Sequence, residues 1–218
     1  MRLIDLSQPL FDNAPNCPAH PAPKSEQTAD HAADGWRMEV LTMASHTGSH
    51  VDAPIHKMAG GKSLSEMSLE TFAGPARIAD LRPMQPDQPI TAADLERTLG
   101  DLEPGEIALL CTGWGEKRAR TEEWLSHSPF LSPEGAEWLV AKQARAVGID
   151  HYSIGGRYDP INSETHTVLL GNGLWVVEEL KFVAEAFTAP RPCLFMALPI
   201  NLQGHSGAYC RPVLVIEA

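Results

Sequence analysis

Three histidines and one aspartate lie close together in residues 46–56, which read HTGSHVDAPIH. In an extended chain, successive side chains alternate between two faces. Four side chains at even positions then point the same way: His46, His50, Asp52 and His56. Val51 and Ile55 point the other way, into a core. A helix would also bring some of these side chains together, but Gly48 weakens it and Pro54 removes a backbone donor, so we expect a strand or an extended loop.

These residue types are metal ligands. Imidazole nitrogen and carboxylate oxygen bind zinc, manganese and iron alike, and the run holds no cysteine for a closed structural zinc site. The HExxH motif of metalloproteases is excluded, because Thr47 follows His46. A chance gathering of surface or helix-cap residues is the alternative, and four ligand-type side chains on one face argue against it. The pattern favours an open, catalytic metal site.

The same run resembles the H-x-G-T-H-x-D-x-P-x-H signature of the cyclase family of metal-dependent hydrolases, which includes bacterial kynurenine formamidases and isatin hydrolases. Ser49 stands where the signature has threonine. The resemblance implies that His46, His50 and Asp52 bind metal and that His56 is a proton shuttle. Similarity extends from the N-terminal segment to the C-terminal segment.

A second pair of candidate ligands lies further along the chain. His166 precedes an apolar run and Glu178 ends one, and neither residue is informative by itself, since a lone histidine in a helix is more often structural. The resemblance implies that both are further metal ligands of a dinuclear site, in which Asp52 or Glu178 bridges two ions. Glu179 competes with Glu178, but strand alternation sends it to the opposite face.

The chemistry of such a site is hydrolytic. A metal lowers the pKa of bound water from about 15.7 to about 7 and polarises a carbonyl, while His56 moves the protons. We therefore expect a metal-dependent amidohydrolase, acting on a small aryl formamide or lactam, with one or two zinc or manganese ions per chain. The ligand types do not discriminate between these metals and iron. The alternatives are a metal-dependent cyclase or lactonase, and a metal-containing binding protein without turnover, against which the presence of His56 speaks.

Several positions near the expected pocket depart from the family pattern or stay open. The proline-rich segment 11–23 is either a linker or a lid, and the resemblance favours a lid. Kynurenine formamidases have tryptophan before the proline that matches Pro18, whereas this chain has Cys17. The loop 154–157 reads Ile-Gly-Gly-Arg where the family usually shows Ser-Ile-Asp. The roles of His20 and His205 remain open.

The bulk composition is that of an ordinary globular protein. The chain has 218 residues, of which 43% are hydrophobic and 21% charged, and its formal net charge is -11. This acidity argues against a nucleic-acid or anionic-membrane partner. The N-terminal residues do not resemble a signal peptide, no apolar run is long enough for a membrane helix, and the four cysteines are scattered, so we expect a cytoplasmic protein with free thiols.

The hydrophobic pattern alternates between strand and helix signals along the chain. We expect strands over 2–6, 36–44, 76–81, 106–112, 146–150, 174–178, 193–200 and 209–216, and helices over 65–72, 91–100, 133–144 and 163–171. The length suits one domain, 1–218. By resemblance, its fold is α/β, with stacked mixed β-layers and a helical layer as in the cyclase-like swivelling β/β/α fold, and the protein is a homo-oligomer.

Overall fold

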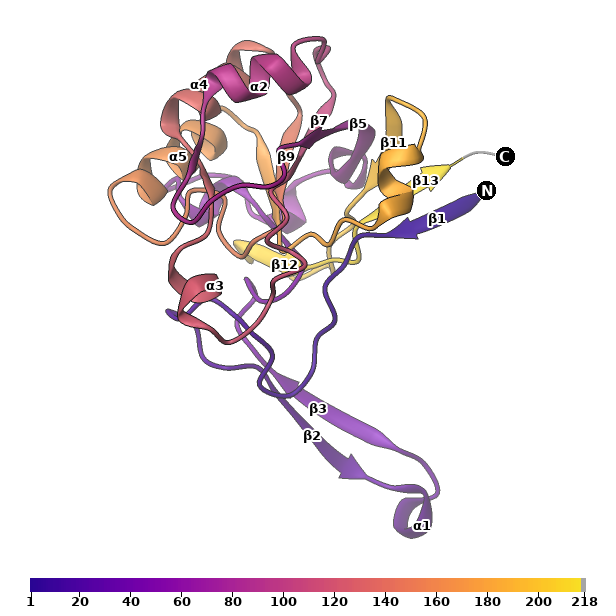
Figure 1. Cartoon of the computed structure of the whole chain (residues 1–218). Coiled ribbons are helices and arrows are strands. Elements are labelled where there is room, and N and C mark those ends of the chain that lie inside the picture. The colour runs from indigo at the N-terminus through magenta and orange to yellow at the C-terminus, as the bar shows by residue number, and fades with distance from the viewer. Residues whose placement is uncertain (217–218) are drawn as a thin grey trace.

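The computed structural model describes residues 1–216, whose main feature is a curled, nine-stranded mixed β-sheet with helices packed on it (Figure 1). The strands lie in the order β1 (Arg2–Asp5), β13 (Val213–Ile216), β11 (Cys193–Met196), β5 (Ala73–Asp80), β7 (Ile107–Cys111), β9 (Ala146–Ile149), β10 (Trp175–Glu178), β4 (His50–Asp52) and β12 (Gly207–Tyr209). The expected α/β fold is confirmed. The last two residues of the expected 1–218 domain lie outside the described residues.

The middle of the sheet is built from parallel strands, β5, β7, β9 and β10. Parallel neighbours need crossover connections, which here contain α2 (Ala92–Leu99), α4 (Pro133–Ala141) and α5 (Ile161–Gly171). Thr91 and Asp94 form a capping box at α2, and the Ser132 hydroxyl accepts a hydrogen bond from the Gly135 amide at the start of α4. These caps fix where the crossover helices begin.

Two hydrophobic cores lie on opposite faces of these strands. Leu110 of β7 packs in the core that contains Leu139 of α4. Its neighbour Leu109 faces the other core, which the curled sheet encloses and which contains Val51 of β4 and Phe195 of β11. Every residue of β7 is buried, as its continuous apolar sequence predicts. Val51 anchors the strand that carries the histidine run, because its side chain is completely buried.

A two-stranded antiparallel arm extends away from the sheet (Figure 1). It consists of β2 (Lys24–Ala29), a short helix α1 (His31–Asp34) and β3 (Met38–Thr42). The strand expected over 36–44 is present as β3, but within residues 1–216 it pairs only with β2. β2 was not expected, since its sequence KSEQTA has no apolar face. All five residues of β3 are exposed, so the arm has no core of its own.

Other elements differ from the expected boundaries for local reasons. The helix expected over 65–72 is two 3-10 helices, η2 (Leu64–Glu66) and η3 (Leu69–Phe72), because Met67 between them is extended. The strand expected over 209–216 is divided between β12 and β13, and Pro212 before β13 cannot donate to a ladder. α5 begins at Ile161, without a side-chain cap from Ser163.

The remaining elements are short. The expected strand over 193–200 ends at Met196. The other elements are β6 (Pro89–Ile90), β8 (Phe130–Leu131), α3 (Glu122–Ser126), η1 (Pro54–His56) and η4 (Ala184–Thr188). None of the helices in residues 1–216 has the length and apolar character needed to cross a bilayer.

Candidate metal centre and active site

Strand β4 lies between β10 and β12 and carries two of the expected ligands. His50 and Asp52 are two residues apart, so they share one face of the strand. In the antiparallel ladder with β10, His50 lies directly opposite Glu178. This pairing brings together two residues that are far apart in the sequence, and both side chains are almost completely buried. The face opposite to Val51 is therefore lined with ligand-type groups.

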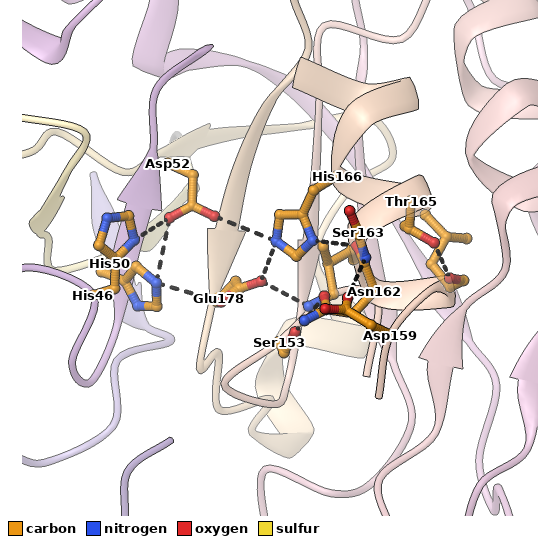
Figure 2. A network of polar contacts seen from close by, with 12 residues as sticks. His46, His50, Asp52, Ser153, Asp159, Asn162, Ser163, Thr165, His166 and Glu178 are labelled. Atoms are coloured by element: carbon orange, nitrogen blue, oxygen red, sulfur yellow. Dashed lines mark hydrogen bonds and ion pairs between the residues drawn. The ribbon is translucent and has the colours of Figure 1, made fainter. Parts of the chain in front are cut away.

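The side chains from four elements converge at this face (Figure 2). His50 Nε2 lies 3.4 Å from Asp52 Oδ1 and 3.3 Å from Glu178 Oε2. His166, from α5, places Nε2 3.6 Å from Glu178 Oε1 and 3.8 Å from Asp52 Oδ2. His46 Nδ1 lies 2.7 Å from Asp52 Oδ1. All five candidate ligands named from the sequence are thus brought to one place.

Backbone carbonyls hold two of the imidazoles in position. The Nδ1 atom of His50 is 2.7 Å from the Gly48 carbonyl oxygen, and that of His166 is 2.8 Å from the Asn162 carbonyl oxygen. A carbonyl only accepts, so in each ring Nδ1 carries the proton and Nε2 is free to bind a metal. His50 Nε2 and Asp52 Oδ2 are buried and have no hydrogen-bond partner in residues 1–216. Such atoms fit a metal ion that both would bind.

The donor atoms form two groups that share one carboxylate. His50, Asp52 and Glu178 each offer an atom within 4.8 Å of the others, and so do His46, Asp52 and His56. Asp52 has two oxygens, so it is able to contribute one to each group. The geometry fits two neighbouring cations as well as one.

The charges of this cluster depend on one another. Burial raises the pKa of Asp52, but contacts with His46 and His50 outweigh burial and hold the pKa well below its usual value. Burial and the charge of Asp52 raise the pKa of Glu178, yet the contacts with His166 and His50 leave it lowered. Burial lowers the pKa of His50, and its two carboxylate neighbours more than reverse this. Two buried carboxylates therefore need cationic partners, and a divalent metal would take this role in place of protonated imidazoles.

His56 reaches the cluster through a turn of the backbone, whereas we expected residues 46–56 to be extended throughout. Only His50–Asp52 is a strand, and Pro54–His56 forms the 3-10 helix η1, whose first position suits the fixed φ of Pro54. Ile55 is consequently 37% exposed and does not enter the core as expected. The ring centroid of His56 lies 4.1 Å from that of His46 and 5.8 Å from that of His166. Burial lowers the pKa of His56, which favours a neutral imidazole.

The cluster opens into a small pocket with a volume of about 150 Å³. The proline-rich segment contributes Cys17, Ala19 and His20 to its wall, in agreement with the lid interpretation. His20 lies 6.4 Å from His46 between ring centroids. His205 does not line this pocket; it is exposed, and its Nδ1 contacts the Gln203 carbonyl.

The lid is fastened to the strand that carries Glu178. Arg118 donates from Nε to Glu179 Oε2 at 2.9 Å and from its terminal nitrogens to the carbonyls of Pro9 and Pro15. Glu179, which has a positive φ of 52°, therefore turns away from the candidate ligands and pairs with Arg118 instead. The choice of Glu178 over Glu179 agrees with this geometry.

Other pocket residues were missed by sequence reasoning. Ser206 lies 2.9 Å from His46 through its hydroxyl, and the adjacent Gly207 leaves room for the His46 ring. The wall also contains Tyr152, Ser153, Gly156, Arg157 and Asn162. A glycine inside a strand signals a close approach, but the expected strand began at residue 209, so Gly207 did not give this signal. The Thr112–Gly115 loop, by contrast, donates hydrogen bonds to buried Asp150 and does not line the pocket.

The chain is similar to proteins of known name along its whole length. It is 30% identical to a kynurenine formamidase of Bacillus cereus over 216 residues, which cover 97% of this chain and 96% of the relative. A kynurenine formamidase of Geobacillus thermodenitrificans is also 30% identical, with the same coverage.

Solved structures share the fold. An isatin hydrolase from Ralstonia solanacearum superposes with a TM-score of 0.85 at 24% identity, covering 99% of this chain and 92% of that one. A structure described as a predicted metal-dependent hydrolase, from Bacillus stearothermophilus, gives a TM-score of 0.78 at 26% identity, covering 98% and 97%. The family model described as "Putative cyclase" matches residues 4–155, which include the histidine run and the strands around it. This chain belongs to the cyclase family.

Proposed function

We propose that the protein is a metal-dependent hydrolase of small amides, of the aryl formamide or lactam type, acting on carbon–nitrogen bonds other than peptide bonds. One observation carries the proposal: two groups of donor atoms share buried Asp52, and their other members line one pocket: His46, His50, His56 and Glu178. The kynurenine formamidases and the metal-dependent hydrolase that resemble this chain support it. A divalent ion, zinc or manganese, would acidify a water molecule and polarise the amide carbonyl there.

The chain's own residues would supply the remaining steps. Asp52 and Glu178 hold negative charge at the base of the pocket, and the imidazoles of His46, His50 and His166 complete the ligand set. His56, neutral and next to His46, accepts a proton from the attacking water and returns it to the leaving nitrogen. An amine leaves poorly without that proton, so amide hydrolysis needs this residue more than ester hydrolysis does.

The test is hydrolysis of a small panel containing a formanilide, a lactam and a lactone. The wild-type protein loaded with zinc or manganese should hydrolyse at least one of the amides, and Asp52→Ala should lose both activity and metal, because it removes the carboxylate common to both donor groups. Turnover of the lactone alone would favour a lactonase. Activity retained in Asp52→Ala would contradict the proposed centre.

We further propose that the centre holds two ions. The support is the separate contact of His166 with Glu178 Oε1 and Asp52 Oδ2, on the side away from His46. Glu178→Gln should lower the metal content from about two to about one per chain or less, since a neutral amide is a poorer ligand than a carboxylate. Elemental analysis of the dialysed proteins measures this. Unchanged stoichiometry would make Glu178 structural.

We also propose that residues 1–218 act as one domain, that the protein works in the cytoplasm, and that it is a homo-oligomer. The exposed apolar side chains of the arm support oligomerisation: Trp36, Met38, Val40 and Leu41 are 66%, 51%, 48% and 61% exposed. An apolar surface of this kind on an arm without a core is typical of an interface. A second copy of the chain is the expected partner.

A further inference from the structure

Arg157 lies in the loop that departs from the family pattern, beside the candidate metal centre. It lines the pocket that contains His46, His50 and Glu178. It also lines a neighbouring hollow of about 380 Å³, whose wall includes the apolar side chains of Phe130, Tyr158 and Ile161. The guanidinium therefore belongs to a side chain that the two spaces share.

The charge of Arg157 has no ion-pair partner within residues 1–216. Among residues 1–216, no carboxylate lies within the 4.0 Å of an ion pair with Arg157. Asp87, which also lines the hollow, lies 2.8 Å from His127, and Asp159 accepts a hydrogen bond from the Ser163 amide. The nearest recorded partner of the guanidinium is the Tyr158 ring, at 6.0 Å. An arginine with an available planar fork of donors is suited to a carboxylate.

The electrostatic effect of Arg157 reaches the pocket wall. Burial raises the pKa of the Cys17 thiol and of the Tyr152 hydroxyl, and in both cases the positive charge of Arg157 opposes the rise. Both residues line the pocket. Among the pocket residues, Arg157 is the one arginine or lysine side chain, so an anionic substrate group has one clear partner besides the metal.

We propose that Arg157 is a specificity-determining residue that binds the carboxylate of the substrate. The substrate class is then a small amide that carries an anionic group, with its amide over the metal ligands and its apolar body against the neighbouring hollow. This inference rests on the proposed amide hydrolysis and deepens it. The pocket of about 150 Å³ has room for a formyl or lactam amide, whereas an aromatic ring fits the larger hollow.

A matched pair of aryl formamides tests the proposal: 2-formamidobenzoate, which carries a carboxylate, and formanilide, which does not. In the metal-loaded protein, Arg157→Gln should reduce kcat/KM for 2-formamidobenzoate by roughly 10- to 100-fold, mainly through KM, because a charge-assisted hydrogen bond is lost. Its kcat/KM for formanilide should fall much less, so that the ratio of the two kcat/KM values decreases. Arg157→Lys should retain part of the preference, as it keeps the charge without the planar fork.

The control is Arg97→Gln, which removes the same charge from the exposed surface of α2. It should leave the ratio of the two kcat/KM values unchanged. If the ratio of the two kcat/KM values were the same in Arg157→Gln and the wild type, the role of Arg157 would be overturned. Hydrolysis of formanilide by both proteins would still uphold the proposed function.

Calorimetric binding of 2-aminobenzoate to the metal-loaded proteins gives a second readout, independent of turnover. Arg157→Gln should bind this carboxylate roughly 10-fold or more weakly than the wild type, and Arg97→Gln should match the wild type. If neither formamide is hydrolysed, amide hydrolysis of this type fails, and the binding experiment still decides the role of Arg157. Equal affinity in wild type and Arg157→Gln would refute it.

Discussion

At the scale of single residues, the site depends on which ring nitrogen of each histidine is already hydrogen-bonded within the protein. The carbonyls of Gly48 and Asn162 occupy Nδ1 of His50 and His166, which leaves both Nε2 atoms facing the carboxylates. Within residues 1–216, no carbonyl holds a ring nitrogen of His56, and its ring lies against that of His46. This difference agrees with the proposed roles, in which His50 and His166 are ligands and His56 transfers protons.

We predict that His56→Ala folds and keeps its metal but loses on the order of 10²–10⁴ in turnover of amides, the range for removal of a general acid–base group. Steady-state kinetics and elemental analysis of the same preparation measure both properties. An ester with a good leaving group serves as the control, and its hydrolysis should fall much less.

His56 also forms a group of possible metal donors with His46 and Asp52, so the metal content of His56→Ala distinguishes a ligand from a proton shuttle. Substantially reduced metal content in His56→Ala would make this residue a ligand and would remove the division of roles proposed above.

The second residue-scale prediction concerns Cys17, which lies in the pocket wall and packs near Trp114, Trp124 and Tyr152. Kynurenine formamidases resemble this chain in the lid but have tryptophan at this position. A stacking contribution of about 0.5–1.5 kcal/mol is therefore missing here. We predict weak use of N-formylkynurenine relative to smaller aryl formamides, compared by kcat/KM. High catalytic efficiency on N-formylkynurenine would show that Cys17 does not set the preference.

Sequence reasoning found the ligand-type residues but not everything that holds them. The alternation of His50 and Asp52 about Val51 was predictable, because it follows from strand geometry alone. The turn at Pro54 was not, since the same residues also fit a continued extended chain. Ser206 was missed because its contact with His46 joins residues 160 positions apart, and nothing local marks it.

At the scale of elements, β4 is the strand on which the site depends. It is bordered by β10 and β12, and Gly207 of β12 lies opposite Asp52. A Cβ atom at Gly207 would lie 2.4 Å from Cε1 of the His46 ring, so a larger residue forces that imidazole to move. The absence of a side chain at Gly207 thus leaves space for the His46 ring and is not needed for the pairing of β12 with β4.

We predict that Gly207→Ala lowers metal affinity by roughly 10- to 100-fold, the usual effect of disturbing the groups around a ligand. Competition with a chromophoric chelator measures the affinity. Gly74→Ala, in β5, is the control, because its Cβ would meet nothing closer than the Arg145 side chain at 3.4 Å. Equal affinity in Gly207→Ala and wild type would mean that His46 is dispensable.

Some helices and strands were predicted from the hydrophobic pattern, whereas others were missed or given wrong boundaries. Strands with continuous apolar runs, such as β7 and β9, were predicted because both of their faces are buried. β2 was missed because KSEQTA has neither an apolar face nor a core to face. Helix α5 was expected to begin at Ser163, but the chain turns helical at Ile161, before any capping hydroxyl.

At the scale of the whole molecule, the curled sheet closes around one core while the arm extends into solvent (Figure 1). The all-exposed β3 has no covering element within residues 1–216. Four large apolar side chains on this arm are too many for an isolated two-stranded ribbon, which is marginally stable by itself. A second copy of the chain packed on the arm, as proposed above, would cover these side chains.

We predict that Trp36→Ala combined with Leu41→Ser shifts the protein toward a monomer, because it removes the two most exposed apolar side chains of the arm. Light scattering during size-exclusion chromatography measures the mass. Glu26→Gln, on the neighbouring strand β2, alters the arm without removing apolar surface and should leave the oligomer intact. A monomeric wild type would contradict the proposed oligomer.

The central claim is that a metal held by the cluster around Asp52 is required for amide hydrolysis, and removal and return of the metal test it most directly. Formanilide turnover should be measured in protein stripped with a chelator and dialysed, and again during stepwise addition of zinc or manganese. We expect no turnover in the stripped protein, and a rise that saturates at about one to two ions per chain. Full activity in the stripped protein would contradict the account.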